Sequence, residues 1–199
     1  QIDTSDAVAM EKALRIYNGK AMVNSVNGKE KVMEEVFPLV KKYGGVLVCL
    51  TLDEKGIPET VEGRIDIAKR IIKKAESYGI AKENLVFDPL CMTVSTNKDN
   101  AKITLECIEK LTNELGVKTV LGVSNVSFGL PNRELLNASF FALAVGQGLS
   151  AGIINPKSDA MMNSYYSYCA LCGLDENFEQ YIANVTETKA EVKTTDVDL

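Results

Sequence analysis

Apolar segments of two kinds alternate along most of this chain of 199 residues. Short segments such as Val46–Leu50 are apolar at every position, which is typical of parallel strands that are buried on both faces. Longer segments such as Val61–Tyr78 carry apolar residues three and four positions apart, which is the period of an amphipathic helix. Strands are therefore predicted at Ala21–Val23, Val46–Leu50, Leu85–Phe87, Lys118–Val123 and Ala151–Ile154, after a strand that ends at Asp3.

A helix is predicted after each of these strands. Thr4, Ser5 and Asp6 supply capping groups for the first helix, and Gly79 is placed to end the third. The predicted helices are Ala7–Tyr17, a segment from Val32 to Tyr43, Val61–Tyr78, a segment with Ile108, Leu111 and Leu115 on one face, Arg133–Gln147 and Ser158–Leu171. Strict alternation of strands and helices predicts βα units in a parallel α/β sheet.

Two architectures contain such units, an open doubly wound sheet and a (β/α)8 TIM barrel. The chain has no GxGxxG motif and no Walker-type phosphate loop, so a nucleotide-binding open sheet has little support. We therefore expect a TIM barrel over residues 1–176. Six strand–helix units are three quarters of a barrel, and the chain starts at Gln1, so the first two βα units are expected to lie upstream.

Composition and charge narrow the range of functions. The formal net charge of −5 argues against a nucleic-acid partner, and no apolar run approaches the roughly 20 residues that span a bilayer. Without a signal peptide, and with an odd number of cysteines, the chain is expected in the reducing cytoplasm. Histidine is absent, which excludes Ser-His-Asp and Cys-His catalysis and argues against a conventional zinc enzyme, so no metal site is predicted. The pair Cys169 and Cys172 is interpreted as two small buried hydrophobic residues.

Polar residues stand at or just after the carboxyl end of each predicted strand. In a barrel such residues converge on one mouth, where TIM-barrel enzymes have their active sites. Carboxylates and carboxamides without a cation suit a flat, neutral ligand rich in N–H donors and ring nitrogens, and they do not suit a phosphate. These residues are Asp3, Asn24, Asp53, Asp88, Ser124 with Asn125, and Asn155.

Each of the main candidates also has a local structural explanation. Asp3 would cap the helix that follows it, and Asn24 would form a turn beside Asn27-Gly28. Asp88 would start a loop before Pro89, and Ser124-Asn125 would cap a later helix. Taken one at a time, the residues leave both interpretations open.

Four of these segments together resemble the motifs of the pterin-binding methyltransferase family: Asp3, Asn24-Ser25, Asp88-Pro89-Leu90 and Gly122-Val-Ser-Asn-Val-Ser127. The resemblance covers residues 1 to about 175, with the motifs in the expected order. It implies that Asp3, Asn24 and Asp88 hydrogen-bond the edge of a pterin ring. It further implies that Asn125 approaches the ring nitrogen that bears a methyl group, that Gly122 and Ser124 line the pocket, and that Arg133 sits near its rim. Asn125 and Asp88 are the residues implied in catalysis.

The resemblance also implies an activity. The barrel would bind 5-methyltetrahydrofolate as substrate and activate its N-methyl group for transfer to the reduced cobalt of a corrinoid such as cobalamin, carried by another domain or protein. Phe128-Gly-Leu-Pro131 resembles the branch of cobalamin-dependent methionine synthase, a 5-methyltetrahydrofolate–homocysteine methyltransferase. Residues 177–199 are then interpreted as the end of the last helix and a polar linker towards a cobalamin-binding module.

Several alternatives stay open. Within the family, the chain would be a stand-alone methyltetrahydrofolate:corrinoid protein methyltransferase. Dihydropteroate synthase is a more distant relative that needs cations for a diphosphate, and no cation stands at the predicted strand ends. A non-catalytic binding barrel is the third alternative. A homodimer is compatible with all of these, and the final methyl acceptor is not decided.

Overall fold

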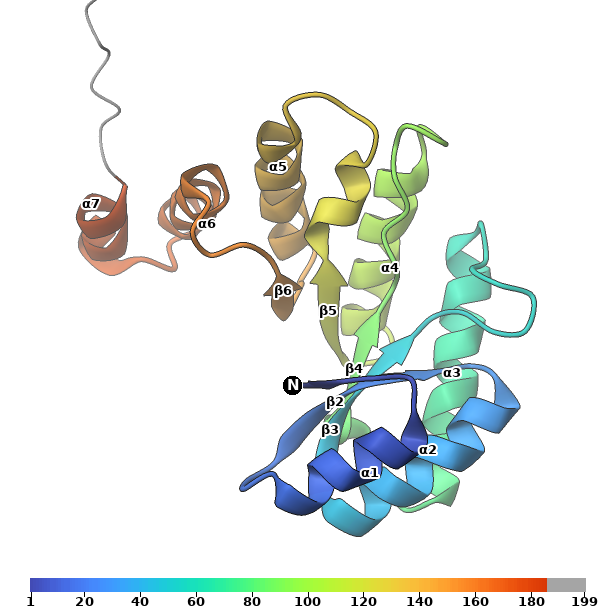
Figure 1. Cartoon of the computed structure of the whole chain (residues 1–199). Helices are drawn as coiled ribbons and strands as arrows, with labels where there is room; N and C mark the ends of the chain where they lie inside the picture. The colour runs from blue at the N-terminus through green and yellow to red at the C-terminus, as the bar shows by residue number, and fades with distance from the viewer. Residues whose placement is uncertain (186–199) are drawn as a thin grey trace, which may run out of the picture.

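The computed structural model describes residues 1–185, in which six parallel strands form one continuous sheet (Figure 1). The strands lie in the sheet in the same order as in the chain, and each pairs with its neighbours in sequence. A doubly wound sheet would instead reverse its strand order at a switch point. The strands are β1 (Ile2–Asp3), β2 (Ala21–Asn27), β3 (Gly45–Leu50), β4 (Leu85–Asp88), β5 (Lys118–Gly122) and β6 (Ala151–Ile153).

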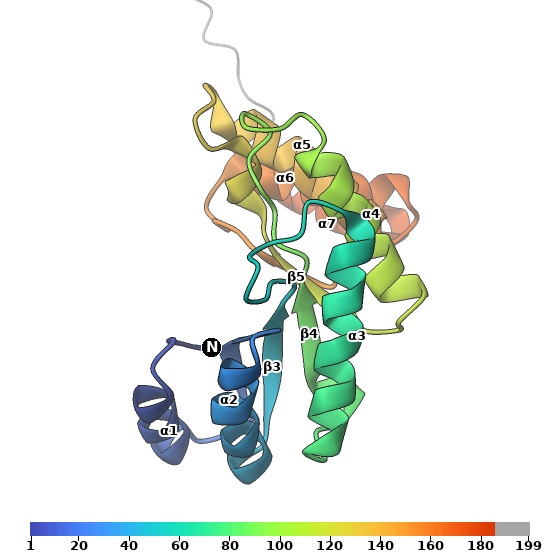
Figure 2. The same ribbon diagram turned by 90° about the vertical axis from the view of Figure 1, so that its right-hand side faces the viewer.

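Each strand is followed by a helix. The α-helices are α1 (Ala7–Ile16), α2 (Glu30–Tyr43), α3 (Val61–Ser77), α4 (Asn100–Asn113), α5 (Arg133–Gly146), α6 (Asp159–Leu171) and α7 (Glu179–Asn184), and the 3-10 turns are η1 (Lys82–Asn84), η2 (Val123–Ser127) and η3 (Glu176–Phe178). Because parallel crossovers are right-handed, a sequential strand order places the crossover helices on one face of the sheet. Figure 2 shows α3 and α4 side by side along this outer face.

Side chains at alternate positions of the strands point to opposite faces of the sheet and belong to two separate apolar cores. On the outer face, the fully buried Leu47 and Phe87 belong to a cluster with residues of α1 to α4. On the inner face, Val48, Val86 and Val120 form a cluster of their own. Helices outside a sequentially ordered parallel sheet, with an apolar interior inside it, are the arrangement of a TIM barrel. The six strands form a half-barrel of this kind, and the predicted fold class is confirmed.

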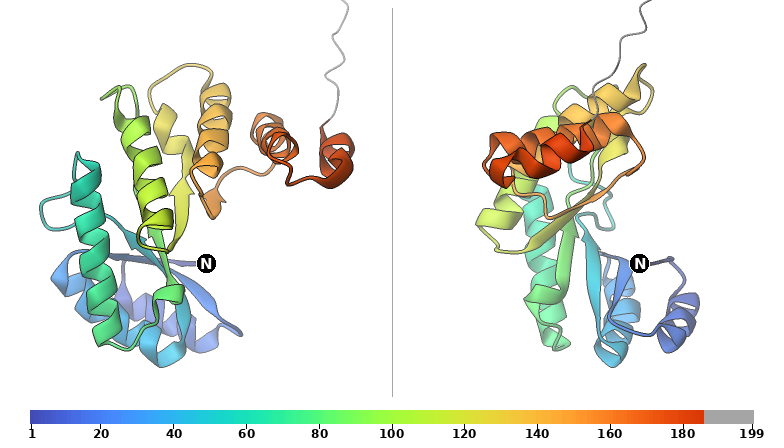
Figure 3. Two further views of the ribbon diagram at one scale, coloured as in Figure 1. Left: turned by 180° about the vertical axis from the view of Figure 1, so that it is seen from behind. Right: turned by 90° about the vertical axis from the view of Figure 1, so that its left-hand side faces the viewer.

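The carboxyl-terminal helices continue the structure past the sheet. Leu121 of β5 and Phe140 and Phe141 of α5 belong to a second outer cluster. Tyr165 of α6 stacks on Phe141, with 6.1 Å between the ring centroids. Figure 3 shows α6 against α5, and α7 beside α6 at the end of the described chain.

The observed elements differ from the predicted ones at a few boundaries. β2 runs to Asn27 rather than to Val23 and contains an irregularity between Asn24 and Val26. β5 ends at Gly122, and the short helix α7 was not predicted. The polar linker predicted after it lies, from residue 186 on, outside the described residues.

The prediction that Cys169 and Cys172 are both buried is wrong for Cys172, which is exposed, whereas Cys169 is half-buried. The reason is that α6 ends at Leu171, so Cys172 lies past the packed part of the helix. Among residues 1–185 there is no helix with the length and apolar content needed to cross a membrane.

Candidate functional site

Asp3, the last residue of β1, lies next to Asn24, in the middle of β2. They are register partners in the parallel ladder, and Asn24 Nδ2 donates a hydrogen bond of 3.2 Å to Asp3 Oδ2. Because a carboxylate only accepts, the amide nitrogen of Asn24 faces Asp3 and its amide oxygen faces away. Asp3 Oδ1 and Asn24 Oδ1 accept no hydrogen bond within residues 1–185, so both are available to a ligand.

The sequence allowed Asp3 to be the N-cap of the first helix, but in the structure another residue caps it. Asp6 is the N-cap of α1, and its Oδ1 accepts the N–H groups of Val8 and Ala9 at 2.8 and 3.3 Å. Asp3 is therefore not required for starting the helix.

A hollow of about 310 Å³ lies beside the Asp3–Asn24 pair. Its size is at the lower end of the range for small-molecule sites, about 300–1,000 Å³. Ser25 and Asn27 of β2 line it together with Thr4 and with Glu35 of α2. Asn27 is a residue that the sequence interpretation missed, because the turn signal Asn27-Gly28 hid the fact that β2 continues to this position.

Asp88 is the last residue of β4, on the face that carries Val86. Its register partner on β3 is the apolar Leu50, and the residue is only 9% exposed. Burial raises the pKa of the Asp88 carboxyl to about 6, against the opposing effects of the Leu90 N–H and the Arg64 charge. The Leu90 N–H donates to Asp88 Oδ1 at 2.8 Å. Asp88 is therefore ionised at neutral pH, with Oδ2 unpaired within residues 1–185.

Asn125 lies on the 3-10 turn η2, directly after β5. The turn exposes Asn125 while it buries Val123 and Val126. Gly122 lies close to the amide, because a Cβ at Gly122 would come within 3.3 Å of Asn125 Nδ2. Helix α5 begins later, with Asn132 as its N-cap, so Asn125 does not cap that helix.

Arg133 is bound to the turn that carries Asn125. Its Nη2 donates to the backbone oxygen of Ser124 and its Nε to Ser127 Oγ, each at 2.9 Å. The guanidinium also lies 4.5 Å from the centroid of the Phe128 ring, a cation–π distance. Ser127 is fully buried and donates to Asn137 Oδ1 at 2.7 Å. In the structure these donors of Arg133 hold η2, and its contact with a ligand stays a prediction.

Sheet topology brings the candidate residues to one edge. Asp3, Asp88 and the η2 turn stand at the carboxyl ends of β1, β4 and β5 in one parallel sheet, and Asn24 lies beside Asp3 in β2, three residues before that strand ends. Only β3 separates β2 from β4, which is about 10 Å at the usual strand spacing. The edge therefore presents free carboxylate and amide acceptors on one side and the exposed Asn125 on the other.

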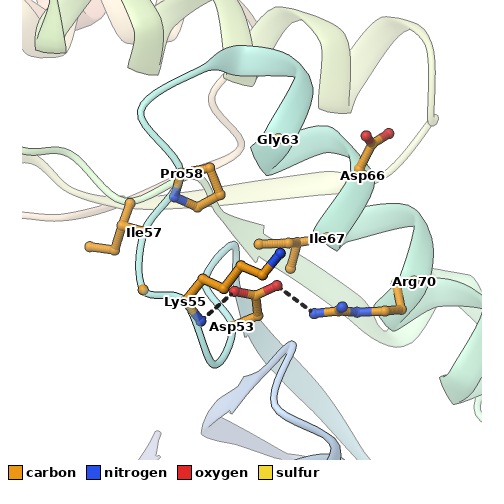
Figure 4. A pocket seen from close by; sticks show the side chains of 9 residues that line it. Asp53, Lys55, Ile57, Pro58, Gly63, Asp66, Ile67 and Arg70 are labelled. Carbon is orange, nitrogen blue, oxygen red and sulfur yellow. Dashed lines mark hydrogen bonds and ion pairs between the residues drawn. The ribbon is translucent and has the colours of Figure 1, made fainter.

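A larger cavity, about 450 Å³, lies on the outer face beside α3, and Figure 4 shows its lining. Asp53, one of the strand-end candidates, points into it and is already paired. Its carboxylate accepts from the Lys55 N–H at 2.9 Å and from Arg70 Nη2 at 3.0 Å, and these contacts lower the pKa of Asp53. Arg70 also donates to the Gly28 oxygen at 2.8 Å. Because the charges of Asp53 and Arg70 neutralise each other, the strand-end edge is the better candidate site despite the greater volume here.

Asn155 and Arg64 both form hydrogen bonds with backbone groups of loops at the carboxyl edge of the sheet. Asn155, after β6, accepts the Lys157 N–H at 3.1 Å and so forms a turn. Arg64 of α3 was not selected from the sequence, yet it is 1% exposed and donates to loop carbonyls beside Asp88. The sequence feature that could have indicated its burial is its position on the apolar face of the helix, three residues after Val61 and four before Ala68.

Comparison with known proteins assigns the family. The family model described as pterin binding enzyme matches residues 1–155. The chain belongs to the pterin-binding enzyme family. This pterin-binding enzyme is 30% identical over 185 residues to the methylcorrinoid:tetrahydrofolate methyltransferase of Eubacterium limosum, covering 90% of this chain and 68% of that protein.

A second relative is matched over only a small part of its own length. The methionine synthase of Mycobacterium tuberculosis is 29% identical over 175 residues, which cover 81% of this chain and 15% of that protein. Among solved structures, the dihydropteroate synthase of Stenotrophomonas maltophilia superposes with a TM-score of 0.70 at 22% identity, over 87% of this chain and 69% of that one. This last similarity supports the partial TIM barrel.

Proposed function

We propose that this pterin-binding enzyme binds 5-methyltetrahydrofolate and activates its N-methyl group for transfer to the reduced cobalt of a corrinoid, in the manner of the folate domain of a cobalamin-dependent methionine synthase. The observation that carries the proposal is a row of acceptors near the carboxyl edge of the sheet that have no partner within residues 1–185. The Asp3–Asn24 pair and the buried carboxylate of Asp88 form this row, and Asn125 stands beyond it.

The acceptors suit the edge of a pterin ring. That edge carries lactam and amino N–H groups, and Asp3 Oδ1, Asn24 Oδ1 and Asp88 Oδ2 are acceptors without partners within residues 1–185. Hydrogen bonds to ionised acceptors are roughly twice as strong as neutral ones, and a low-dielectric setting such as that of Asp88 strengthens them further. Selectivity for a ring with several N–H donors follows from this arrangement.

Asn125 serves the chemical step in this proposal. A tertiary amine is a poor leaving group, so methyl transfer requires stabilisation of the electron density that builds up on the ring nitrogen. A carboxamide is not an acid at neutral pH, so Asn125 orients a proton or a water at that nitrogen. Gly122 leaves room for its amide, and Arg133 holds the turn on which it stands.

The corrinoid supplies the nucleophile for the methyl group. The name of the E. limosum relative includes a methylcorrinoid, so a cobalamin-binding domain or a separate corrinoid protein is the proposed partner, with the cytoplasm as the proposed location.

A stand-alone methyltransferase is the second candidate. Its support is the E. limosum relative, whose name describes transfer between a methylcorrinoid and tetrahydrofolate and which is matched over 68% of its length. The methionine synthase is matched over 15%. The same site would serve transfer of the methyl group from the folate to the corrinoid and from the corrinoid to the folate, because the forward and reverse reactions share one transition state.

Calorimetry with 5-methyltetrahydrofolate tests the binding half of the proposal. We expect saturable binding to the purified protein, and an affinity at least tenfold lower in Asp88→Ala. Methyl transfer to free reduced cobalamin, followed by the change in corrinoid absorbance, tests the chemical half. Absence of folate binding, or an unchanged affinity in Asp88→Ala, contradicts the proposal. Binding without transfer would instead identify a non-catalytic folate-binding barrel.

A further inference from the structure

Arg64 is a buried cation whose hydrogen bonds all go to main-chain oxygens. Its side chain is 1% exposed, and no ion pair of it occurs within residues 1–185. Nε donates to the Pro58 oxygen at 2.9 Å, and Nη1 donates to the oxygens of Pro89 and Leu90 at 2.8 Å each. A buried charge is costly unless it is hydrogen-bonded, and here two loops, after β3 and after β4, supply the acceptors.

The Leu90 oxygen bound by Arg64 belongs to a residue in the left-handed conformation. Leu90 has φ of 64°, which residues with a Cβ disfavour. In this conformation the Leu90 N–H donates to Asp88 Oδ1. Arg64 thus holds Leu90 by its carbonyl, and Leu90 holds Asp88 by its amide.

We propose that Arg64 is a positioning residue for the folate site, which holds the Asp88–Leu90 turn through its backbone and so directs the Asp88 carboxylate to the pterin edge. This inference rests on the proposed function, because it assigns Asp88 to the ligand. Arg64 does not touch the ligand. It acts through the backbone of the turn and through its positive charge.

In the described residues, the charge that favours ionised Asp88 comes from Arg64, and the Asp88 carboxylate in turn acts on the Cys91 thiol. On the sheet, Asp88 lies between Leu50 of β3 and the position of Val120 on β5. Cys91 in the same loop and Cys107 of α4 share the interior with Arg64, but burial raises the pKa of each thiol to about 11. Both thiols are neutral below pH 8, so Arg64 supplies the charge that favours ionised Asp88.

Carbon-detected NMR titration of Asp88 in the unliganded protein tests the inference without any folate. Arg64→Met keeps much of the side-chain volume and removes the charge and the donors, and we expect the Asp88 midpoint to rise above that of the wild type. Arg64→Lys keeps the charge, so its midpoint should stay near that of the wild type. Arg70→Met is the matched control on the same helix, because Arg70 pairs with Asp53 on the outer cavity, and it should leave Asp88 unchanged.

Calorimetry with 5-methyltetrahydrofolate at pH 7.5 measures how much the hydrogen bonds from Arg64 to the loop carbonyls contribute to folate affinity. Arg64→Lys has fewer donors for the loop carbonyls, so we expect its dissociation constant to rise about tenfold, while Arg70→Met binds as the wild type does. An unshifted Asp88 midpoint in Arg64→Met, or wild-type affinity in Arg64→Lys, overturns the inference. If Arg64→Met does not fold, the affinity of Arg64→Lys decides alone. Failure of the wild type to bind folate would refute the proposed function, whereas the NMR result would still report on Arg64.

Discussion

The Asn24 side chain donates a hydrogen bond of 3.2 Å to the Asp3 carboxylate across two neighbouring parallel strands. This contact decides which atom of Asn24 faces a ligand, because the carboxylate of Asp3 engages the amide nitrogen. Two oxygens, one from each residue, are then directed to a ligand as acceptors. The geometry favours recognition of N–H groups over recognition of carbonyl groups at this end of the site.

Asp3→Asn is expected to weaken folate binding without loss of stability. The substitution removes an ionised acceptor, and hydrogen bonds to charged groups contribute about 1.5–3 kcal/mol, so the dissociation constant should rise about 10- to 100-fold. Asp3 is exposed and is not the helix cap, so the melting temperature should not change. Calorimetry and thermal unfolding measure the two quantities.

The matched control is Asp6→Ala, three residues along the chain. It removes the N-cap of α1 and should lower the free energy of unfolding by about 1 kcal/mol while folate affinity is retained. Equal effects of the two substitutions on binding would contradict the assignment of Asp3 to the ligand.

Asp88→Asn is expected to stabilise the unliganded protein above pH 6 and to abolish tight folate binding. The pKa of Asp88 is raised from 3.8 to about 6, so its ionisation opposes folding: the cost is absent below pH 4, grows between pH 4 and 6, and is complete above pH 6. The full shift corresponds to roughly 3 kcal/mol, and we expect a gain of about 1–3 kcal/mol at pH 7.5.

Urea unfolding at pH 4 and at pH 7.5 checks this expectation. Asp53→Asn should instead lower the free energy of unfolding at pH 7.5, because the pKa of Asp53 is lowered and its ionised form stabilises the fold. A stability gain in Asp88→Asn that is the same at both pH values would show that desolvation of the charge is not its cause.

Folate affinity of the wild type is expected to fall as the pH falls through about 6. Binding uses ionised Asp88, so the affinity should be constant above pH 7 and approach a tenfold loss per pH unit below 6, for uptake of one proton. Calorimetry between pH 5 and 8 measures the profile. In Asp88→Asn the residual affinity should not follow this profile, and a retained midpoint there would place the titrating group elsewhere.

Asn125→Ala is expected to slow methyl transfer about 100-fold or more while folate binding changes less than tenfold, because its contribution is made at the ring nitrogen in the transition state. Gly122→Ala should slow transfer in the same direction by a smaller factor, because the added Cβ would lie 3.3 Å from Asn125 Nδ2 and displace the amide slightly. Single-turnover transfer to reduced cobalamin and calorimetry separate rate from affinity. Equal losses of rate and of affinity would assign Asn125 to ground-state binding.

Arg133→Met distinguishes a role in the η2 turn from a role in binding the folate tail. Its donors hold Ser124 and Ser127, so the variant should transfer methyl groups about tenfold more slowly from 5-methyltetrahydrofolate and from a tail-less methyltetrahydropterin alike. A defect confined to the substrate with the glutamate tail would support the rim contact that the family resemblance implies. Phe128→Leu is the control for the stacking contact.

Much of the fold could be predicted from local patterns. The prediction of a strand at Val46–Leu50 and of a helix at Val61–Tyr78 rests on the burial of whole segments. Such a prediction holds even when the ends of the segment are placed a few residues wrongly. The absence of a phosphate loop favoured the barrel, and the sequential strand order confirmed it. The course of β2 past Asn24 was less predictable, because Asn27-Gly28 is a turn signal that the sheet overrides.

The sequence by itself determined the order of βα units, the apolar interior and exterior of the half-barrel, and the polar residues at the strand ends. These features follow from the period of the chain and from the family motifs. Only the tertiary structure decided that Asn24 turns its nitrogen to Asp3, that Asp53 is paired with Arg70 on the outer face, and that Arg64 supports the Asp88 turn. The residues in these pairs are 17 to 26 positions apart in the sequence. The direction of each side chain is therefore set by neighbours that are distant in the chain, which a local sequence pattern does not reveal.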